Sequence, residues 1–272
     1  MSNSIVIKAP AKVNITLYIQ GMVGDYHDLE SLMAKIDLFD VITITPRNDN
    51  EVTVTYSTGE NYPRDNALKA TTKIINNYGL NGVDVIIQKG VPEGVGLGGS
   101  AVDAAGIARG ISELYGVSFS NDFLITLGGD VPFLASEYSS ALVRGKGEKL
   151  TQVPLNARNA LLIYGSERVS TAEVFAKYDQ LMQERGVSGS KVGSLMAHNV
   201  LEGAAIEVNP RIKQYRDTLR EAKFQNVVMT GSGAGFIAIN FDESEFDDKV
   251  NRAIALCEQR GFCYKMITMG KN

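Results

Sequence analysis

The stretch Pro92-Glu-Gly-Val-Gly-Leu-Gly-Gly-Ser-Ala101 joins a predicted strand to a predicted helix, and this junction decides the fold class. The strand is Val83–Gln88, which is rich in β-branched residues. From Ser100 to Leu114 apolar residues recur at helical spacing, which predicts the helix. Between them lie four glycines within residues 94–99, and glycine allows backbone N–H groups to approach a ligand closely.

The glycine-rich loop is predicted to bind an anion, because it ends where a helix begins. A helix start offers N–H groups without intrahelical partners and a partial positive charge. Together with the glycines, these groups favour phosphate as the ligand. A tight surface turn is the alternative, and the number of glycines before the helix makes it the less favoured one.

Three other nucleotide loops do not fit this stretch. Gly94, Gly96 and Gly99 have the spacing of the dinucleotide fingerprint, but the acid at the required distance, Glu113, falls inside the predicted helix. A protein-kinase loop would be accompanied by His-Arg-Asp and Asp-Phe-Gly tripeptides, and the chain has neither. No Gly-Lys-Ser or Gly-Lys-Thr follows any glycine loop, which excludes a P-loop.

The composition predicts a cytoplasmic protein with a local anion site. The 272 residues are 44% hydrophobic, which is enough for one large domain or two small ones. A net charge of −4 gives no general attraction for nucleic acid or for an anionic membrane. Two cysteines without a disulfide framework indicate a reducing compartment, and with the two histidines they show no metal-ligand spacing. The first residues lack a secretory apolar segment.

The pattern along the chain predicts an α+β protein whose strands are mostly antiparallel. Strands are predicted over Ile5–Ile7, Val13–Ile19, Val41–Thr45, Val52–Tyr56, Ala141–Arg144, Ala160–Tyr164, Val227–Thr230, Phe236–Asn240 and Cys263–Thr268, and further helices over Ala67–Tyr78, Thr171–Arg185, Pro210–Ala222 and Phe246–Arg260. Asn48-Asp-Asn50 is expected to turn a hairpin between two of these strands. A second unit is expected to begin within residues 151–158, and Gly186–Gly193 to form a flexible joint.

Two short motifs carry charged residues that are candidates for chemistry. In Ala9-Pro-Ala-Lys-Val-Asn14, Lys12 lies in an early strand, where a solvated lysine is the commoner outcome. In Leu127-Gly-Gly-Asp-Val-Pro-Phe133, Asp130 follows two glycines and precedes an apolar segment. A half-buried carboxylate at this position could act as a general base or hold a cation, and a helix cap is the alternative.

Two further motifs are candidates for ligand contact. In Gly24-Asp-Tyr-His-Asp28, Tyr26 could stack on a base and His27 could form a hydrogen bond to it, and a polar turn is the alternative. Met229-Thr-Gly-Ser-Gly-Ala-Gly235 is a second glycine turn. Its three glycines within residues 231–235 favour a ligand-lining turn over an ordinary hairpin.

In this order, the four motifs and the central loop resemble the GHMP kinase superfamily. Residues 92–101 are similar to its phosphate loop, Pro-x-Gly-x-Gly-Leu-(Gly/Ser)-Ser-(Ser/Ala), with Gly99 where a serine is common. Within the superfamily, the chain most resembles the family of kinases that phosphorylate 4-diphosphocytidyl-2-C-methyl-D-erythritol in non-mevalonate isoprenoid synthesis. Motifs of that family are also matched by Asp65-Asn66, Lys89, Gly145-x-Gly-Glu148, Val169-Ser-Thr-Ala172, Asn199-x-Leu-Glu202 and Gly231-Ser-Gly-Ala234.

The resemblance implies a two-lobed GHMP kinase fold with the site in the cleft between the lobes. A ribosomal-S5-like N-terminal half is expected over residues 1–155 and a ferredoxin-like C-terminal half over residues 156–272. The expected activity is ATP- and Mg²⁺-dependent phosphorylation of a hydroxyl on a small cytidine-diphosphate alcohol. The expected assembly is a monomer or a homodimer, with no nucleic-acid or membrane partner.

The resemblance also implies a role for each matching residue. Asp130 is expected to accept the proton of the acceptor hydroxyl, and Lys12 to lower the pKa of that hydroxyl and keep Asp130 ionised. The residues expected to bind ATP are Asn66, Lys89, Pro92, Gly94, Gly96, Leu97, Gly98, Gly99 and Ser100, and those expected to bind the acceptor are Asn14, Tyr26 and His27. Ser100 is also the candidate to help order Mg²⁺.

Two alternatives remain open at this point. One is another GHMP kinase, acting on mevalonate, phosphomevalonate, homoserine or a sugar, and the Tyr26-His27 pair argues against it because those acceptors carry no base. The other is a non-catalytic nucleotide-binding protein on the same fold, and the presence of both Lys12 and Asp130 argues against it.

Overall fold

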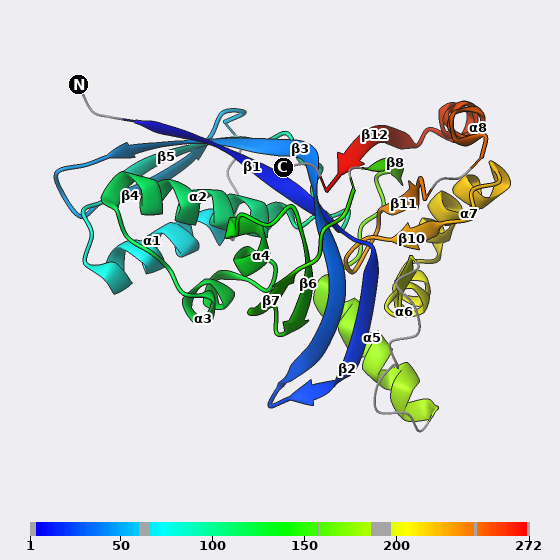
Figure 1. Cartoon of the computed structure of the whole chain (residues 1–272), viewed down its shortest axis with the longest axis horizontal. Coiled ribbons are helices and arrows are strands. Elements are labelled where there is room, and N and C mark those ends of the chain that lie inside the picture. The colour runs from blue at the N-terminus through cyan, green and yellow to red at the C-terminus, as the bar shows by residue number, and fades with distance from the viewer. Residues whose placement is uncertain (1–3, 60–65, 157, 186–196, 242–243, 271–272) are drawn as a thin grey trace.

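A long, strongly bent strand connects the two halves of the molecule in the computed structural model, which describes residues 4–59, 66–156, 158–185, 197–241 and 244–270 (Figure 1). The strands are β1 (Ile5–Asn14), β2 (Thr16–Val23), β3 (Tyr26–Pro46), β4 (Val52–Tyr56), β5 (Val83–Gln88), β6 (Ser140–Gly145), β7 (Lys149–Gln152), β8 (Arg158–Tyr164), β9 (His198–Asn199), β10 (Val227–Met229), β11 (Phe236–Ile239) and β12 (Cys263–Met269). The helices are α1 (Asn66–Tyr78), α2 (Gly99–Tyr115), α3 (Asn121–Leu124), α4 (Val131–Ala135), α5 (Thr171–Glu184), α6 (Glu202–Val208), α7 (Lys213–Glu221) and α8 (Phe246–Arg260). The mixture confirms the predicted α+β class.

Strand β3 organises the sheet because it pairs with five other strands. It lies antiparallel to β1, β2, β5, β6 and, through one residue pair, β12. Strands β12, β8, β11 and β10 follow in antiparallel order and form the part of the sheet that belongs to the C-terminal half. Burial alternates along β3 over Leu38–Ile44, where every second residue is buried and those between are half-buried or exposed, which is the period expected of a strand with one face against a core.

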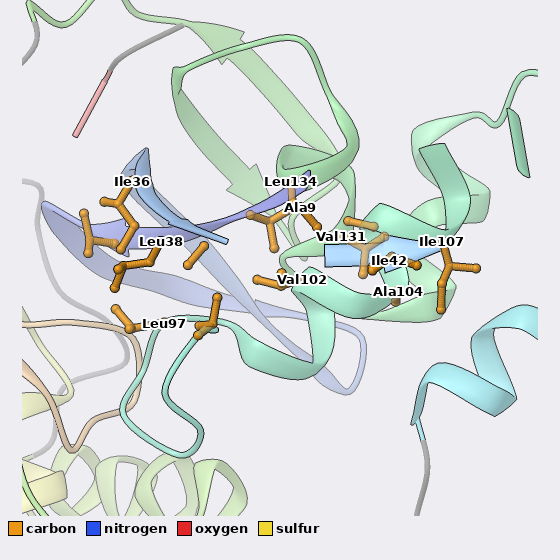
Figure 2. Packing of buried hydrophobic residues seen from close by; sticks show 14 of the residues in the cluster. Ala9, Ile36, Leu38, Ile42, Leu97, Val102, Ala104, Ile107, Val131 and Leu134 are labelled. Atoms are coloured by element: carbon orange, nitrogen blue, oxygen red, sulfur yellow. The ribbon is translucent and has the colours of Figure 1, made fainter. Parts of the chain in front are cut away.

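Helix α2 packs closely on the sheet and carries the glycine loop with it. Gly106 makes this approach feasible, since a Cβ added there would lie 2.4 Å from Cδ1 of Ile42. In Figure 2, Val102, Ala104 and Ile107 of α2 lie among the buried side chains of the surrounding elements. The other labelled residues of this cluster are Ala9, Ile36, Leu38, Ile42, Leu97, Val131 and Leu134. The end of the loop and the start of α4 therefore share one core.

Most predicted elements are confirmed, with small shifts at their ends. Strand β5 and helix α8 have the predicted bounds, α1 begins one residue earlier at Asn66, and α2 begins at Gly99. The predicted helix over residues 210–222 is divided into a 3₁₀ turn, Pro210–Ile212, and α7. The predicted joint at residues 186–193 lies outside the described residues.

The predicted hairpin around residues 48–50 is wrong. Strand β4 does not pair with β3 but runs parallel to β5, which lies between the two. Arg47 holds the connection by ion pairs to Asp49, Glu51 and Asp84, and Asp84 belongs to β5. The turn sequence is compatible with a hairpin, and the position of β5 prevents one.

The predicted break between the strand over Ile5–Ile7 and the one from Val13, a stretch that includes Pro10, is also wrong. Strand β1 runs through this position, and the register against β3 shifts between Pro10 and Lys12. A β-bulge accommodates a proline because the irregularity removes the need for one ladder hydrogen bond. The break between β1 and β2 lies instead at Ile15, whose N–H donates to the carbonyl of Leu32.

The division at residue 155 stays a prediction, as do the likenesses to ribosomal S5 and to ferredoxin. Elements β1–β7 and α1–α4 precede this residue, and the remaining strands and helices follow it. One apolar cluster nevertheless contains residues of both parts, among them Ile42 and Ile237.

Candidate active site

Lys12 and Asp130 form an ion pair at the centre of the molecule. Lys12 lies in β1 and is 3% exposed, and its Nζ is 3.3 Å from Oδ2 of Asp130. The same ammonium donates to Oδ1 of Asn14 at 2.6 Å and to the carbonyl of Gly96 at 3.2 Å. The solvated position considered for Lys12 is therefore wrong. Its ammonium is held in a fixed place beside the carboxylate of Asp130.

Asp130 has a carboxylate that faces a cavity. The residue immediately precedes α4, yet its side chain forms no capping hydrogen bond with that helix. The capping alternative is therefore wrong for the side chain, which is 28% exposed. A carboxylate that is paired with one lysine and open to a cavity can accept a proton from a bound hydroxyl.

The glycine loop lies directly beside this pair. A Cβ added at Gly98 would be 3.2 Å from Cε of Lys12 and 3.4 Å from Oδ2 of Asp130. Gly98 also has a φ of 80° and precedes α2 without a side-chain cap. The free N–H groups at the start of a helix thus lie next to the lysine and the aspartate, where a transferred phosphate would need them.

The second glycine turn packs against the first. Gly235 N–H donates to the carbonyl of Val95 at 3.1 Å, and the Thr230 hydroxyl donates to the carbonyl of Gly96 at 3.2 Å. Gly96 needs both its φ of 82° and its lack of a side chain, since a Cβ there would lie 1.9 Å from the carbonyl oxygen of Thr230. The ligand-lining role predicted for this turn is consistent with the place of Gly231, Ser232 and Gly233 on the cavity wall.

Asn14 joins the two halves beneath the cavity. Its Oδ1 accepts from Lys12 Nζ and from the N–H of Gly231 at 3.0 Å, and its Nδ2 donates to the hydroxyl of Ser31 at 2.8 Å. On the opposite side, Asn199 donates to the carbonyls of Met229 and Gly231. Both asparagines are buried, so the glycine turn is held by fixed amide groups.

A cavity of about 560 Å³ contains most of the predicted site residues. Those on its wall are Lys12, Asn14, Asn66, Gly94, Gly96, Leu97, Gly98, Gly99, Ser100 and Asp130. The C-terminal half contributes residues of α5, such as Phe175, and the glycine turn. Lys89, Pro92, Tyr26 and His27 are not on this wall, and Asp65 lies outside the described residues.

The side chain of Lys89 is held by two carboxylates and does not line the cavity. Its Nζ is 2.7 Å from Oδ2 of Asp40 and 2.8 Å from Oδ2 of Asp103. Burial lowers the pKa of Lys89, but the Asp103 and Asp40 carboxylates together outweigh this effect. The pKa of Lys89 is therefore raised above its ordinary value. Burial raises the pKa of the Asp103 carboxyl to about 7, against the opposite influence of Lys89.

Tyr26 and His27 begin β3 at the end of the β2–β3 hairpin. Tyr26 is 60% exposed, and Nζ of Lys146 lies 4.2 Å from the centre of its ring. His27 contacts α5, with Nε2 2.8 Å from Oδ1 of Asp179 and its ring 4.7 Å from that of Phe175. His27 is therefore connected to the cavity through Phe175, which lies on its wall, and Tyr26 precedes it on the hairpin.

Four residues of this arrangement were not singled out from the sequence. Asp40 and Asp103 are acids in otherwise apolar segments, which is a detectable signal of a buried partner. Phe175 and Asp179 lie one helical turn apart in α5, where an aromatic and an acid give no signal of their own.

Comparison with known proteins agrees with this geometry. Residues 65–138 match the GHMP kinases N terminal domain. The 4-diphosphocytidyl-2-C-methyl-D-erythritol kinase of Caldicellulosiruptor saccharolyticus is 32% identical, with 90% of this chain and 92% of the relative covered. The chain belongs to this family of GHMP kinases. The enzyme of the same name from Syntrophomonas wolfei is 30% identical, with 90% of this chain and 92% of the relative covered.

Solved GHMP kinase structures have the same fold. A crystal structure of 4-(cytidine 5'-diphospho)-2C-methyl-D-erythritol kinase is 27% identical and superposes with a TM-score of 0.76, covering 98% of this chain and all of the other. The homoserine kinase of Cytophaga hutchinsonii superposes with a TM-score of 0.69 at 18% identity, covering 98% of this chain and 95% of the other. The GHMP kinase fold predicted from the sequence is thereby confirmed.

The described residues lack two kinds of feature. They contain no group of three or more histidine, cysteine or acidic side chains placed to hold a metal ion. None of their helices combines the length and the apolar character needed to span a bilayer.

Proposed function

We propose that this protein transfers the terminal phosphoryl group of ATP to a hydroxyl of 4-diphosphocytidyl-2-C-methyl-D-erythritol. The observation that carries the proposal is the Lys12–Asp130 pair, whose atoms lie 3.3 Å apart beside the glycine loop. Relatives at about 30% identity over most of the chain bear the name of this kinase. Phosphoryl transfer to an alcohol needs groups that bind the phosphates and a group that accepts the hydroxyl proton, and the loop and Asp130 can provide them.

In this proposal the glycine loop and the start of α2 bind the phosphates of ATP. Backbone N–H groups of residues 96–100 would donate to phosphate oxygens, and the positive end of α2 would offset their charge. Asn66 of α1 lies on the same cavity wall and is the candidate for contact with the nucleoside. These donors are fixed by Thr230 and Gly235, so they need little rearrangement when charge develops.

Asp130 would accept the proton of the acceptor hydroxyl as its oxygen attacks the terminal phosphorus. Lys12 would lower the pKa of that hydroxyl by placing its positive charge beside it. General-base assistance of this kind contributes about 10²–10⁴-fold to a rate. Asn14 holds the ammonium of Lys12 in place by its 2.6 Å hydrogen bond, which gives it a positioning part beside its predicted contact with the acceptor.

A magnesium ion that arrives with ATP fits the oxygen donors of this cavity. The hydroxyl of Ser100 and the carboxylate of Asp130 both lie on its wall, and Mg²⁺ in kinases needs only one or two protein oxygens beside the phosphates. When bound, the ion neutralises charge on the transferred group. Ala101 and Val102 supply no hydroxyl, so Ser100 is the candidate ligand from the loop.

A panel of acceptors tests the proposal against both alternatives. The protein is incubated with Mg²⁺, ATP and one of the cytidine-diphosphate alcohol, mevalonate, phosphomevalonate, homoserine or galactose, and ADP release is measured. Turnover restricted to the cytidine-diphosphate alcohol is expected. A preference for another alcohol would indicate a different GHMP kinase, and ATP binding without turnover of any acceptor would indicate a non-catalytic protein.

Cytoplasmic localisation and a monomeric or dimeric state belong to the same proposal.

A further inference from the structure

An ion pair crosses the base of the glycine loop. Lys89 is the first residue after β5, and Asp103 lies in the first turns of α2, so the two residues stand on either side of the loop. Lys89 Nζ and Asp103 Oδ2 are 2.8 Å apart, although 14 residues separate them along the chain. The contact therefore fixes the distance between the two ends of the loop. We call this ion pair the loop clasp.

Asp40 of β3 anchors the loop clasp to the sheet. Its Oδ2 lies 2.7 Å from Lys89 Nζ, and its Oδ1 accepts from the N–H groups of Gly90 at 2.7 Å and Val91 at 2.9 Å. Asp40 is fully buried and belongs to the strand that organises the fold. One carboxylate thus holds both the lysine and the first two backbone amides of the loop.

The loop clasp is not the arrangement expected if its only effect were to stabilise the folded state. Asp103 is 5% exposed, and among the described residues its Oδ1 has no hydrogen-bond partner. A buried charge with an unmade hydrogen bond costs free energy, and apolar residues of similar size often replace buried ion pairs without loss of stability. Its position across the loop, by contrast, has a direct geometric consequence for the site.

We propose that Asp103 is a positioning residue, which acts through Lys89 to hold the glycine loop in its phosphate-binding conformation. This inference rests on the proposed function, in which the loop binds ATP. Asp103 is one helical turn from Ser100, so the loop clasp also sets the direction in which the start of α2 faces the cavity. Without it, the loop remains attached through Asp40 at its beginning but is free to separate from α2 at its base.

Asp103→Leu is the variant that isolates this effect. It removes the loop clasp and leaves Lys89 paired with Asp40, so no buried charge loses its last partner. Hydrogen exchange of the amides of residues 94–99 is measured without ligand, and binding of a non-hydrolysable ATP analogue by calorimetry. Because one charge-assisted hydrogen bond is lost, we expect the exchange rates of these loop amides to rise about tenfold. The dissociation constant of the ATP analogue should rise by about the same factor. Asp103→Asn, which keeps a hydrogen-bond acceptor for Lys89, should recover part of both effects.

Asp84→Leu is the matched control. Asp84 lies near the other end of β5 and pairs with Arg47, which keeps Asp49 as a partner after the change. This control should bind the analogue and exchange its loop amides as the parent does. If Asp103→Leu does not fold, Asp103→Asn is tested instead. Its loop exchange and its dissociation constant for the analogue should both exceed the parental values, by less than expected for the leucine variant.

A folded Asp103→Leu variant with parental loop exchange and parental binding would overturn the positioning role. Faster exchange confined to regions outside residues 94–99 would also overturn it, because that is the result of general destabilisation. The exchange measurement needs no nucleotide. A parent protein that does not bind ATP would therefore refute the proposed function, while the loop exchange would still decide whether the loop clasp exists.

Discussion

At the scale of single residues, Asp130 is the group on which turnover should depend most. Asp130→Asn keeps the shape of the side chain but removes its basicity and its charge beside Lys12. We expect the rate to fall about 10²–10⁴-fold, because the hydroxyl loses its general base. The ATP affinity should stay nearly parental, since the backbone donors of the loop are untouched. Steady-state rates and calorimetry check both expectations, and a near-parental rate would remove Asp130 from the mechanism.

The carboxyl of Asp103 makes a residue-scale contribution to stability that depends on pH. Burial raises its pKa from 3.8 to about 7, so between these values the folded protein binds a proton that the unfolded chain has released. Stability from this group is complete below pH 3.8 and is lost as the pH rises through 7. The charged groups that act on this carboxyl are Lys89, which lowers its pKa, and Asp40, which raises it.

The melting temperature of Asp103→Asn should therefore rise relative to that of the parent as the pH increases. The difference between variant and parent is expected to become more favourable to the variant from pH 4 to pH 8 and to level off above about pH 7, where titration of Asp103 is complete. Melting curves at several pH values measure this difference. A difference independent of pH would mean that Asp103 keeps its ordinary pKa in the folded protein.

At the scale of elements, the glycine loop and the Met229–Gly235 turn form one unit. Gly96→Val should raise the Michaelis constant for ATP steeply, because a side chain at Gly96 would overlap the carbonyl of Thr230 and would need a φ of 82°. Enzyme kinetics measure the effect, and melting temperatures show whether the variant is folded. If a folded variant keeps the parental ATP affinity, the loop is not the phosphate site.

Helix α4 depends on a lysine at the end opposite to Asp130. Lys35 Nζ donates to the carbonyl of Ser136, the residue that ends α4, at 2.5 Å. Burial lowers the pKa of Lys35 to about 8, helped by Arg109 and partly opposed by Glu137. Charge at a helix C-terminus stabilises it by about 0.3–1 kcal/mol. The ammonium thus helps to fix the short helix that begins after Asp130.

Lys35→Met should lower kcat about two- to fivefold and leave the Michaelis constant for ATP unchanged, as removal of a helix-terminal charge predicts. The parent loses its ammonium as the pH rises through about 8, so the two rates should converge above that pH. Rates measured from pH 6 to pH 9 test this. A constant ratio over the whole range would show that the charge of Lys35 has no part in placing Asp130.

At the scale of the whole molecule, the edge of the cavity is built where the two halves meet. There His27 of the β2–β3 hairpin contacts Asp179 and Phe175 of α5, and Phe175 lies on the cavity wall. In Figure 1 the lower part of the hairpin lies near α5, and the His27–Asp179 contact joins them. Acceptor specificity is therefore expected to depend on both halves, whereas the phosphate loop belongs to the first.

Tyr26→Ala should weaken acceptor binding about ten- to a hundredfold, because stacking of a base on an aromatic ring contributes about 1–3 kcal/mol. ATP affinity should hardly change. Met22→Ala is the matched control, since Met22 is exposed on the same hairpin and pairs with His27. Inhibition by CDP should exceed inhibition by UDP in the parent. Equal inhibition, or full activity on an alcohol without a base, would assign the chain to another GHMP kinase activity.

The sequence by itself determined what depends on local pattern. Strand β5, the glycine loop and helices α2 and α8 follow from β-branched content, glycine spacing and helical periodicity, all of which are read over a few neighbouring residues. The motif order around the loop also led to the family and to the pairing of Lys12 with Asp130. These features were predictable because close neighbours in the chain set them, or because the resemblance supplied the partner.

Only the tertiary structure decided which distant residues meet. Strand β4 pairs with β5 instead of β3, although its turn sequence suits a hairpin. Asp40 lies in β3, Lys89 directly follows β5 and Asp103 lies in α2, and their spacing along the chain does not predict that they share a buried network. The physical reason is that these contacts arise from burial against the core and from backbone register, which depend on the packing of all the elements at once.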